Sequence, residues 1–331
     1  MISIVVPIYN GEDYISSFTE SCKNQIYHDF EIIFVNDGSS DNSLEKLVSL
    51  RQESQLVIKI INQKNQGVSS ARNEGIKLAT GEYICFCDID DEISSKYLSE
   101  MLTQIKKNSV DLVVCKMKFI KQISRKFDKI KQLENTENKT YEVQVLSQIE
   151  ALEKYLFSEF QSGCCNILVR RNILLDNAIG FPLGYKYNED IYTLWKILSC
   201  VNSIALIDIE LYYYKQRHDS AMSKFDNNRL DGLTLMKSLE PFFKNNNPQF
   251  YNKYKRYGAS RIAWSLLWQS AIFMNYIDYR EFSKQIKFKL YCKNLITYPQ
   301  LRVSLSAALF FISPSLFRYM SIKLKPYRYK Q

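Results

Sequence analysis

The sequence predicts an α/β protein with a mostly parallel sheet flanked by helices, followed by a helical C-terminal region. Over the first 120 residues, short apolar runs alternate with amphipathic stretches, as in β-α-β units. Polar clusters follow three of these runs, and a helical pattern dominates from Asn227 onward. The chain has 331 residues, which is enough for one large domain or two modest ones.

The predicted strands of the first half are short, apolar and rich in β-branched residues. Strands of this kind are typical of parallel sheets whose two faces are covered by helices. The strands are expected at Ile2–Ile8, Phe30–Val35, Leu56–Ile61, Glu82–Cys87 and Asp111–Phe119. The intervening helices are expected at Asp13–Asn24, from Asp41 or Ser43 to Glu53, at Ser69–Ala79 with Gly81 just beyond, and at Ser95–Lys107.

The second half begins with residues 121–140, which are rich in Lys, Asn, Glu and Thr and predict a surface loop or a weakly ordered insert. Further helices are expected at 147–157 and 189–200, and further strands at 164–170, Ile204–Ile209 and Leu211–Lys215. We therefore expect a first domain over residues 1–225 and a second, basic and aromatic helical region over residues 226–331.

Three polar clusters come directly after predicted strands: Tyr9-Asn10-Gly11, Asn36-Asp37-Gly38 and the acidic segment 88–91. In a parallel sheet the carboxyl ends of the strands share one edge, and ligands bind beyond it. The acidic segment holds three carboxylates, and carboxylate oxygens suit Mg²⁺ or Mn²⁺ bound together with the phosphates of a substrate. An acidic turn before a helix that starts near Ser94 explains the same residues. Taken alone, the segment leaves both interpretations open.

Composition argues against several other classes of protein. Eight cysteines lack paired Cys-x-x-Cys spacing and only His28 and His218 are present, so zinc chemistry is not expected. Gly11 stands alone after the first strand, without the Gly-x-Gly-x-x-Gly turn of a dinucleotide oxidoreductase. The Gly/Arg/Lys-rich phosphate loop at the start of sugar-phosphate nucleotidyltransferases is also missing.

The net charge of +9 is unevenly distributed, because residues 251–331 contain 15 Lys and Arg but only Asp278 and Glu281 as acids. This pattern suggests contact with an anionic surface, with a solvated helical face as the alternative. Leu305–Phe317 is too short to span a bilayer and is broken by Pro314. It is expected either to lie on a membrane or to pack against the catalytic domain. No secretory signal is visible, so we expect a cytoplasmic protein, with peripheral contact at the inner face of the membrane as a further hypothesis.

Seven segments in order resemble the inverting family 2 glycosyltransferases with a GT-A fold. The segments are Ser3–Asn10, Val35–Asp41, Asn65–Gly75, Gly81-Glu82-Tyr83, Asp88-x-Asp90-Asp91, Asn188-Glu189-Asp190 and Tyr214-x-x-Arg217-x-x-Ser220-x-x-Ser223. The resemblance covers residues 1–225 and implies a nucleotide-binding GT-A domain. It further implies transfer of one hexosyl or N-acetylhexosaminyl unit from a nucleotide sugar, in the first place a UDP-sugar, with Mn²⁺ or Mg²⁺ as cofactor.

The acceptor implied by the resemblance is a glycan or a polyprenyl-diphosphate-linked saccharide in the biosynthesis of a bacterial surface polysaccharide, such as a capsule or exopolysaccharide. Processive synthases of the family carry transmembrane helices and a Gln-x-x-Arg-Trp motif, neither of which is present here. Transfer of a single sugar is therefore expected. A non-catalytic membrane-surface or glycan-binding module with a degenerate GT-A fold remains the alternative; nucleic acid is not an expected partner.

A nucleotide-sugar donor needs a platform for its base and a partner for the polar edge of that base. Pro7 and Tyr9 at the end of the first strand are expected to offer a stacking face. Asp37 is expected to accept a hydrogen bond from a uracil N–H, as an Asp in this turn does in the family, or else to stabilise its own turn. Arg72 is expected to reach the base or the phosphates of the donor, or to be an ordinary surface arginine.

The family assigns separate roles to the acidic segment, with Asp88 at the ribose, Asp90 on the metal and Asp91 supporting the metal or the sugar. Asp190 matches the general base of the family, although an acid at a helix start is also common in ordinary helices. Its neighbour Glu189 is expected to contact the acceptor or to be structural. A loop that can fold over the donor is expected to bring Arg217 to the diphosphate and His218 to the metal, while a solvated or structural His is the alternative.

Overall fold

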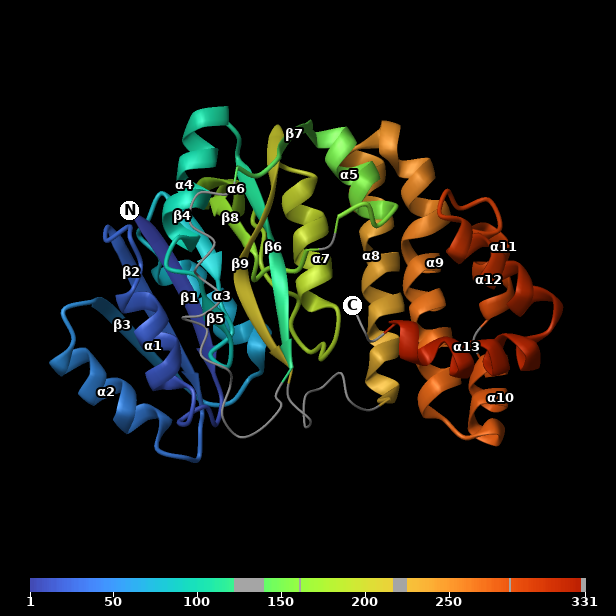
Figure 1. The fold of residues 1–331 in the computed structure, drawn as a ribbon, viewed down its shortest axis with the longest axis horizontal. Helices are drawn as coiled ribbons and strands as arrows, with labels where there is room; N and C mark the ends of the chain where they lie inside the picture. The colour runs from blue at the N-terminus through green and yellow to red at the C-terminus, as the bar shows by residue number, and fades with distance from the viewer. Residues whose placement is uncertain (122–139, 161, 217–224, 286, 329–331) are drawn as a thin grey trace. The chain divides into compact units, whose positions relative to one another are not determined.

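The computed structural model describes residues 1–121, 140–160, 162–216, 225–285 and 287–328 (Figure 1). The chain divides into two compact units. The first unit comprises Met1–Ala151, Gln161–Gly184 and Glu189–Ser220, and the second comprises Leu152–Phe160, Tyr185–Asn188 and Ala221–Gln331. Two short segments ahead of residue 220 therefore belong to the second unit.

One mixed sheet runs through the first unit, and in the described residues its strands follow the order β3-β2-β1-β4-β8-β6-β9-β5, with β7 paired to β9. The strands are β1 (Ile2–Ile8), β2 (Phe30–Asp37), β3 (Val57–Gln63), β4 (Tyr83–Phe86), β5 (Glu92–Ile93), β6 (Leu112–Lys121), β7 (Val143–Ser147), β8 (Ile167–Arg170) and β9 (Ser203–Gln216). The helices are α1 (Ile15–Lys23), α2 (Ser43–Glu53), α3 (Val68–Leu78), α4 (Tyr97–Asn108), α5 (Gln148–Leu156), α6 (Arg171–Asp176) and α7 (Glu189–Leu198). The predicted fold class, a mostly parallel sheet flanked by helices, is confirmed.

The parallel half of the sheet consists of β3, β2, β1 and β4. Register pairs Ile8 with Asn36, so the polar residues that follow β1 and β2 emerge at the same edge. Pairing of β1 with β4 stops at Val5, whose carbonyl accepts the Cys87 amide at 3.0 Å. Pro7 lies two residues beyond Val5, where β4 has ended. The sheet therefore loses no hydrogen bond to β4 through the missing N–H of Pro7.

The other half of the sheet departs from the expected β-α-β pattern. β8 is antiparallel to both β4 and β6, and β9 is parallel to β6. The two strands expected at Ile204–Ile209 and Leu211–Lys215 are one strand, β9, whose partner β6 absorbs a register shift around Lys116. The short strands β5 and β7 and the helix α6 were not predicted. β5 and β7 both pair antiparallel with β9, and such distant pairing leaves no local signal in the sequence.

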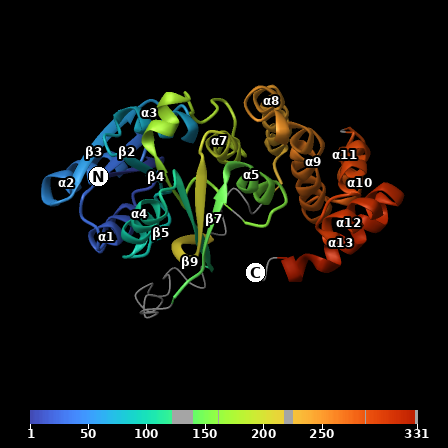
Figure 2. The same cartoon turned by 90° about the horizontal axis from the view of Figure 1, so that it is seen from above.

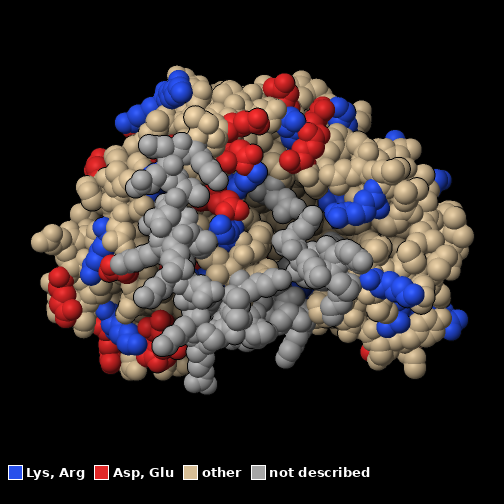
Figure 3. Space-filling view, viewed as in Figure 1, with Lys and Arg blue, Asp and Glu red and all other residues tan. Residues whose placement is uncertain are grey.

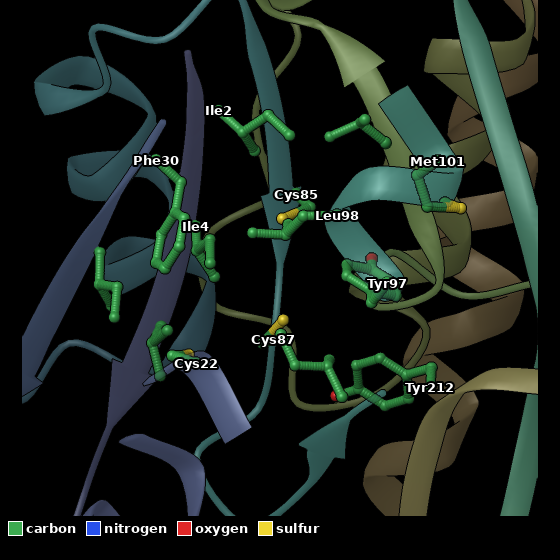
Figure 4. Packing of buried hydrophobic residues seen from close by; sticks show 14 of the residues in the cluster. Ile2, Ile4, Cys22, Phe30, Cys85, Cys87, Tyr97, Leu98, Met101 and Tyr212 are labelled. Atoms are coloured by element: carbon green, nitrogen blue, oxygen red, sulfur yellow. The ribbon is translucent and has the colours of Figure 1, made fainter. Parts of the chain in front are cut away.

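Helices cover both faces of the sheet, with α1 and α4 on one face and α3 and α7 on the other (Figures 1 and 2). The first face holds a hydrophobic cluster that includes alternate residues of β1, such as Ile2 and Ile4, together with Tyr97 and Met101 of α4 (Figure 4). On the second face α3 packs directly on β1, since a Cβ at Gly75 would lie 2.3 Å from Val5 Cγ1. The absence of a side chain at Gly75 therefore sets how closely α3 approaches the sheet.

The second unit is helical, as predicted, and holds an aromatic core. Its helical elements are η2 (Asn227–Leu230), α8 (Asp231–Asn246), α9 (Pro248–Phe273), α10 (Tyr276–Gln285), α11 (Phe288–Leu295), α12 (Leu301–Ile312) and α13 (Pro314–Arg328). The ring centres of Phe243 in α8 and Tyr254 in α9 lie 4.1 Å apart, and those of Trp268 in α9 and Phe317 in α13 lie 5.3 Å apart. No described helix combines the length and the apolar character that crossing a bilayer requires.

Glu31 generates a testable prediction about the stability of the sheet. The side chain is buried and accepts hydrogen bonds from Ser3 and Thr80, while Lys59 lies 2.6 Å away. Burial alone would raise the pKa of Glu31, but Lys59, Ser3 and Thr80 lower it to about 2. We expect Glu31→Gln to lower the free energy of unfolding by about 2–3 kcal/mol at pH 7, measured by urea denaturation.

Because the folded pKa lies below the ordinary value of 4.5, this stabilisation is complete above pH 4.5 and is lost as the pH falls toward 2. The difference between wild type and Glu31→Gln should therefore shrink over that window. Glu45→Gln on the exposed side of α2 is the control, expected within about 0.5 kcal/mol of wild type. A difference that stays constant from pH 7 to pH 3 would contradict the assignment.

Candidate active site at the carboxyl edge of the sheet

Tyr9 and Asn10 form the turn after β1. Tyr9 is 56% exposed, whereas Pro7 is buried between strands, so of these two predicted stacking residues only Tyr9 offers a free ring face. Asn10 adopts a left-handed backbone, with φ of 50°. Its amide donates to Ser39 Oγ at 3.0 Å and its Oδ1 accepts from Ser40 N at 2.8 Å, which ties the turn after β1 to the turn after β2.

Asp37, the last residue of β2, holds the loop that leads into α3. Its Oδ1 accepts hydrogen bonds from Gln63 Nε2 at 2.6 Å and from Gln66 N at 2.9 Å, and its Oδ2 accepts one from Gly67 N at 2.8 Å. Gly67 has φ of 88°, a backbone conformation that favours glycine. These contacts are not to the turn of Asp37 itself but to the end of β3 and the loop between β3 and α3, so Asp37 helps to position α3, the helix that carries Arg72. Contact of Asp37 with a uracil N–H stays a prediction.

Arg72 is buried between two carboxylates from distant parts of the chain. Its Nη2 lies 2.8 Å from Asp88 Oδ1 and its Nη1 lies 3.2 Å from Glu189 Oε1, while the guanidinium lies 5.1 Å from the centre of the Phe181 ring. Burial alone would lower the pKa of Arg72, but Asp88 and Glu189 raise it well above its ordinary value. The cation therefore ties α3, the end of β4 and the start of α7 to one point.

Asp91 locks the acidic segment onto β9. Its Oδ2 accepts from Tyr212 Oη at 2.7 Å and its Oδ1 accepts from Lys215 N at 2.9 Å. One residue later, Glu92 forms an ion pair with Lys215 Nζ, and β5 adds antiparallel pairing with β9. The turn after β4 is thus held by strand pairing and by buried polar contacts, and it is not simply the acidic entry to a helix.

Two adjacent cysteines in the segment before β8 donate to Asp88 and to the backbone of Asp190. Cys165 Sγ lies 3.5 Å from Asp88 Oδ2, and Cys164 Sγ lies 3.3 Å from the carbonyl oxygen of Asp190. Burial, followed by the negative charge of Asp190, raises the pKa of Cys164, and burial with Asp88 raises that of Cys165. Both side chains are therefore protonated thiols that act as weak hydrogen-bond donors.

Glu189 and Asp190 open α7. Burial and then the charge of Asp190 raise the pKa of Glu189 to about 7, although Arg72 opposes the shift. Burial also raises the pKa of Asp190. Asp190 Oδ1 accepts from the Ile191 amide at 2.7 Å, and a Cβ at Gly163 would lie 3.0 Å from Oδ2. A carboxylate with raised proton affinity beside a position that admits only a small residue is chemically suited to accept a proton.

The three carboxylates of the acidic segment, Asp88, Asp90 and Asp91, bring negative charges close together. Burial and then the charges of Asp88 and Asp90 raise the pKa of Asp91 well above its ordinary value. Asp88 pairs with Arg72 and both oxygens of Asp91 accept hydrogen bonds. Asp88 and Asp90 are both partly exposed, whereas Asp91 is buried. In the part of the chain that the structure describes, no three His, Cys, Asp or Glu side chains form a metal cage. Carboxylate oxygens such as those of this turn are chemically suitable ligands for a Mg²⁺-like ion that is bound together with the phosphates of a substrate.

The structure places most of the predicted site residues at one edge of the sheet. Asp88 contacts Arg72, whose other carboxylate partner is Glu189, and Asp190 follows Glu189 at the start of α7. Asp90 and Asp91 follow Asp88 in the same turn, and Tyr9 and Asp37 lie at the ends of neighbouring strands. Arg217 and His218 lie outside the described residues, so their roles stay predictions.

Sequence reasoning missed three groups at the site, namely Tyr212, Lys215 and the thiol pair Cys164 and Cys165. Tyr212 and Lys215 read as ordinary residues of an apolar strand, and their partner Asp91 lies more than 120 residues away. Cys164 and Cys165 were the first residues of the strand predicted at 164–170, and their spacing did not mark them as part of the site.

Replacing Arg72 should destabilise the protein much more than replacing an exposed cation of the same helix. Arg72→Met leaves Asp88 and Glu189 without their counter-charge, so we expect the free energy of unfolding to fall by about 3–5 kcal/mol at pH 7. Lys77→Met, on the same helix, removes only an exposed pair with Glu74 and is expected to cost less than about 1 kcal/mol. Urea denaturation of both variants measures the difference, and equal costs would contradict the buried ion-pair account.

Comparison with known proteins identifies the family of the chain. The family model described as glycosyl transferase family 2 matches residues 3–175. A putative glycosyltransferase, EpsH of Bacillus subtilis (strain 168), is 31% identical over 257 residues, covering 74% of this chain and 70% of the relative. A poly(ribitol-phosphate) beta-glucosyltransferase of Bacillus spizizenii is 32% identical over 226 residues, covering 67% of this chain but 33% of that relative.

Among solved structures, S. aureus TarS 1–349 in complex with UDP-GlcNAc matches with a TM-score of 0.64 at 22% identity, covering 100% of this chain and 92% of that one. At this identity the likeness establishes the fold, which agrees with the mixed sheet and the helical second unit described above. The family match, the curated relatives and the fold agree with the resemblance seen in the sequence motifs. The chain belongs to glycosyl transferase family 2 and is a glycosyltransferase with a GT-A fold.

Proposed function

We propose that the protein transfers one sugar, with inversion, from a nucleotide-sugar donor to a saccharide acceptor. The observation that carries the proposal is Asp190, whose pKa is raised by burial and which lies beside the pair formed by Arg72 and Asp88. A base of higher proton affinity than an ordinary Asp is what deprotonation of a sugar hydroxyl calls for.

In the proposed reaction Asp190 takes the proton from the acceptor hydroxyl. The acceptor oxygen forms a bond to the anomeric carbon of the donor on the face opposite the leaving group. The bond between that carbon and the diphosphate oxygen breaks, and its electron pair stays on the nucleoside diphosphate. Attack opposite the leaving group inverts the anomeric configuration. Glu189, paired with Arg72, orients the start of α7 and thereby Asp190.

The donor is proposed to lie across the carboxyl edge of the sheet. Tyr9 would stack on the base, Asp37 would face its polar edge, and Asp88 would accept from the ribose hydroxyls. Asp90 would hold Mn²⁺ or Mg²⁺, which when bound offsets the charge of the departing diphosphate. UDP is the proposed nucleotide, because the TarS structure that shares this fold was solved with UDP-GlcNAc.

The proposed acceptor is a glycan or lipid-linked saccharide of a bacterial surface polymer. The support comes from the relatives, whose names include an Eps glycosyltransferase and a poly(ribitol-phosphate) glucosyltransferase. All eight cysteines are free thiols, which supports a reducing compartment such as the cytoplasm.

Peripheral contact of the second unit with a membrane is proposed from its last two helices. Leu305 and Ile312 on α12 and Leu316 on α13 are exposed, with Ile312 at 80%. An apolar pocket of ≈ 380 Å³ lies between α9, α12 and α13, and Trp264 and Phe317 form part of its wall. Exposed apolar side chains on basic helices are typical of segments that lie on anionic membranes.

Release of UDP from a panel of UDP-sugars, with a lipid-linked saccharide acceptor present, tests the proposal. We expect Asp190→Asn to lower kcat at least about 100-fold, because the acceptor loses its base. In the wild-type protein, Mn²⁺ is expected to stimulate UDP release and EDTA to remove that stimulation. In Asp90→Ala we expect no stimulation of UDP release by Mn²⁺. Asp176→Asn, at the end of α6, is the matched control and should keep wild-type kcat.

Two outcomes of this assay would contradict the proposal in different ways. Near-normal transfer by Asp190→Asn, together with a dead Asp90→Ala, would overturn the assignment of the base. No turnover with any nucleotide sugar would favour the non-catalytic module instead.

A further inference from the structure

A cationic pocket lies wholly within the second unit and outside the candidate active site. Its volume is ≈ 550 Å³, a size typical of small-molecule sites. It is lined by α10, by Lys287 ahead of α11, and by the first turns of α11 and α13. Four of its lining residues are cations: Arg280, Lys284, Lys287 and Lys289.

The wall of this pocket also contains buried aromatic rings. Tyr279, Phe288 and Phe310 are at most 1% exposed and line the pocket. Tyr279 Oη donates to the Pro314 carbonyl at 3.1 Å, and Tyr276 Oη lies 3.2 Å from Ser315 Oγ, so both tyrosines are tied to the start of α13. The pocket therefore has a fixed wall, unlike a patch of solvated lysines on one helix.

No carboxylate balances the four cations within the described part of the chain. None of them forms an ion pair with a described acid. Asp278 and Glu281 share α10 with two of the cations but do not line the pocket, and Asp278 accepts a hydrogen bond from Asn275 at 2.7 Å. Figure 3 shows the same imbalance on one side of the molecule, where basic side chains are spread over the C-terminal helices and acidic ones are nearly absent.

Two cations are placed against the usual electrostatic preference of a helix. The N-terminal end of a helix carries partial positive charge and unpaired amides, so acids are favoured there and cations are not. Lys287 is the N-cap of α11 and Lys289 lies in its first turn, with no acid in that turn. The start of α13, with Ser315, also lines the pocket and also lacks an acid. An anion in the pocket would offset charge that is otherwise unfavourable.

Arg318 adds positive charge behind the tyrosine wall. Its guanidinium lies 5.8 Å from the ring centres of both Tyr276 and Tyr279, and it donates to the Met274 carbonyl at 2.8 Å. Its Nε atom is buried and has no hydrogen-bond partner. The guanidinium therefore lies beside the two tyrosines of the pocket wall and adds a further positive charge near them.

We propose that this pocket binds a phosphate group of the acceptor, which makes phosphate esters, as phosphodiester or diphosphate, part of the acceptor class. The inference rests on the proposed glycosyl transfer. The oxygens of a phosphate ester can accept from several cations and from the amides at a helix start at once. The rings beside the cations suit the sugar, polyol or prenyl part next to such a phosphate.

Binding of a short poly(glycerol phosphate) chain, measured by calorimetry with saturating UDP so that the candidate donor site does not contribute, tests the proposal. The pocket variant carries Arg280→Gln, Lys284→Gln, Lys287→Gln and Lys289→Gln together. The control variant removes the same charge from exposed positions elsewhere in the unit, through Arg256→Gln, Lys237→Gln, Lys244→Gln and Lys255→Gln. A second arm replaces the chain by phosphatidylglycerol vesicles, and a third by citrate.

We expect the pocket variant to bind the phosphate chain at least about 10-fold more weakly and the control variant to stay within about 2-fold of wild type, a difference of about 1.4 kcal/mol. Weak citrate binding is also expected. Vesicle binding lost in the pocket variant, without binding of the soluble chain, would assign the same phosphate chemistry to a lipid headgroup. Equal loss in both variants, equal affinity for citrate, or no binding by wild type would overturn the proposal.

Activity separates this inference from the proposed function. For a phosphate-bearing acceptor we expect the pocket variant to raise KM with kcat unchanged, and for the same saccharide without phosphate we expect no change in KM. Turnover with an unchanged KM for both acceptors would sink the pocket proposal and leave the glycosyl transfer standing. Pocket-specific binding in a protein that transfers no sugar would do the reverse.

Discussion

The buried guanidinium of Arg72 is the interaction on which the candidate site depends. It joins Asp88 at the end of β4 to Glu189 at the start of α7, residues that lie 101 positions apart in the sequence. Its own position is set by Asp37, which holds the loop before α3. Removing one partner from a buried ion pair costs several kcal/mol, because the other charge is left without compensation. The contacts of Arg72 therefore resist displacement of α3 or α7. One residue thus couples the strand end that is proposed to face the donor to the helix that carries the proposed base.

The same arrangement explains how several carboxylates serve different roles within one small region. Asp88 is neutralised by Arg72, Asp91 is committed to Tyr212 and to the backbone of β9, and Asp190 keeps a raised proton affinity through burial. Asp90, which like Asp88 is partly exposed, is the acid proposed to bind an ion that arrives with the substrate. The environment of each acid, more than its residue type, separates structural support from the proposed proton transfer and the proposed metal binding.

Sequence alone predicted the parallel half of the sheet and the edge at which the site lies. Strands such as Ile2–Ile8 carry a continuous apolar pattern, and the turns after them hold Asn, Asp and Gly, so both signals are local. The antiparallel half was not predicted, because β8 and β5 owe their direction to partners far away in sequence. For the same reason the burial of Arg72 and the contact of Asp91 with Tyr212 could not be read from spacing, whereas the family motifs did locate the acids themselves.

Inversion at the anomeric carbon is the central claim of this account, because a base on the face opposite the leaving group has no use in a retaining transfer. Proton NMR of the glycosidic linkage formed from an α-linked UDP-sugar measures it directly, since the coupling between the first two ring protons of a gluco-configured sugar distinguishes α from β. The account predicts a β-linked product from wild-type protein. An α-linked product would contradict the role given to Asp190 and with it the proposed mechanism.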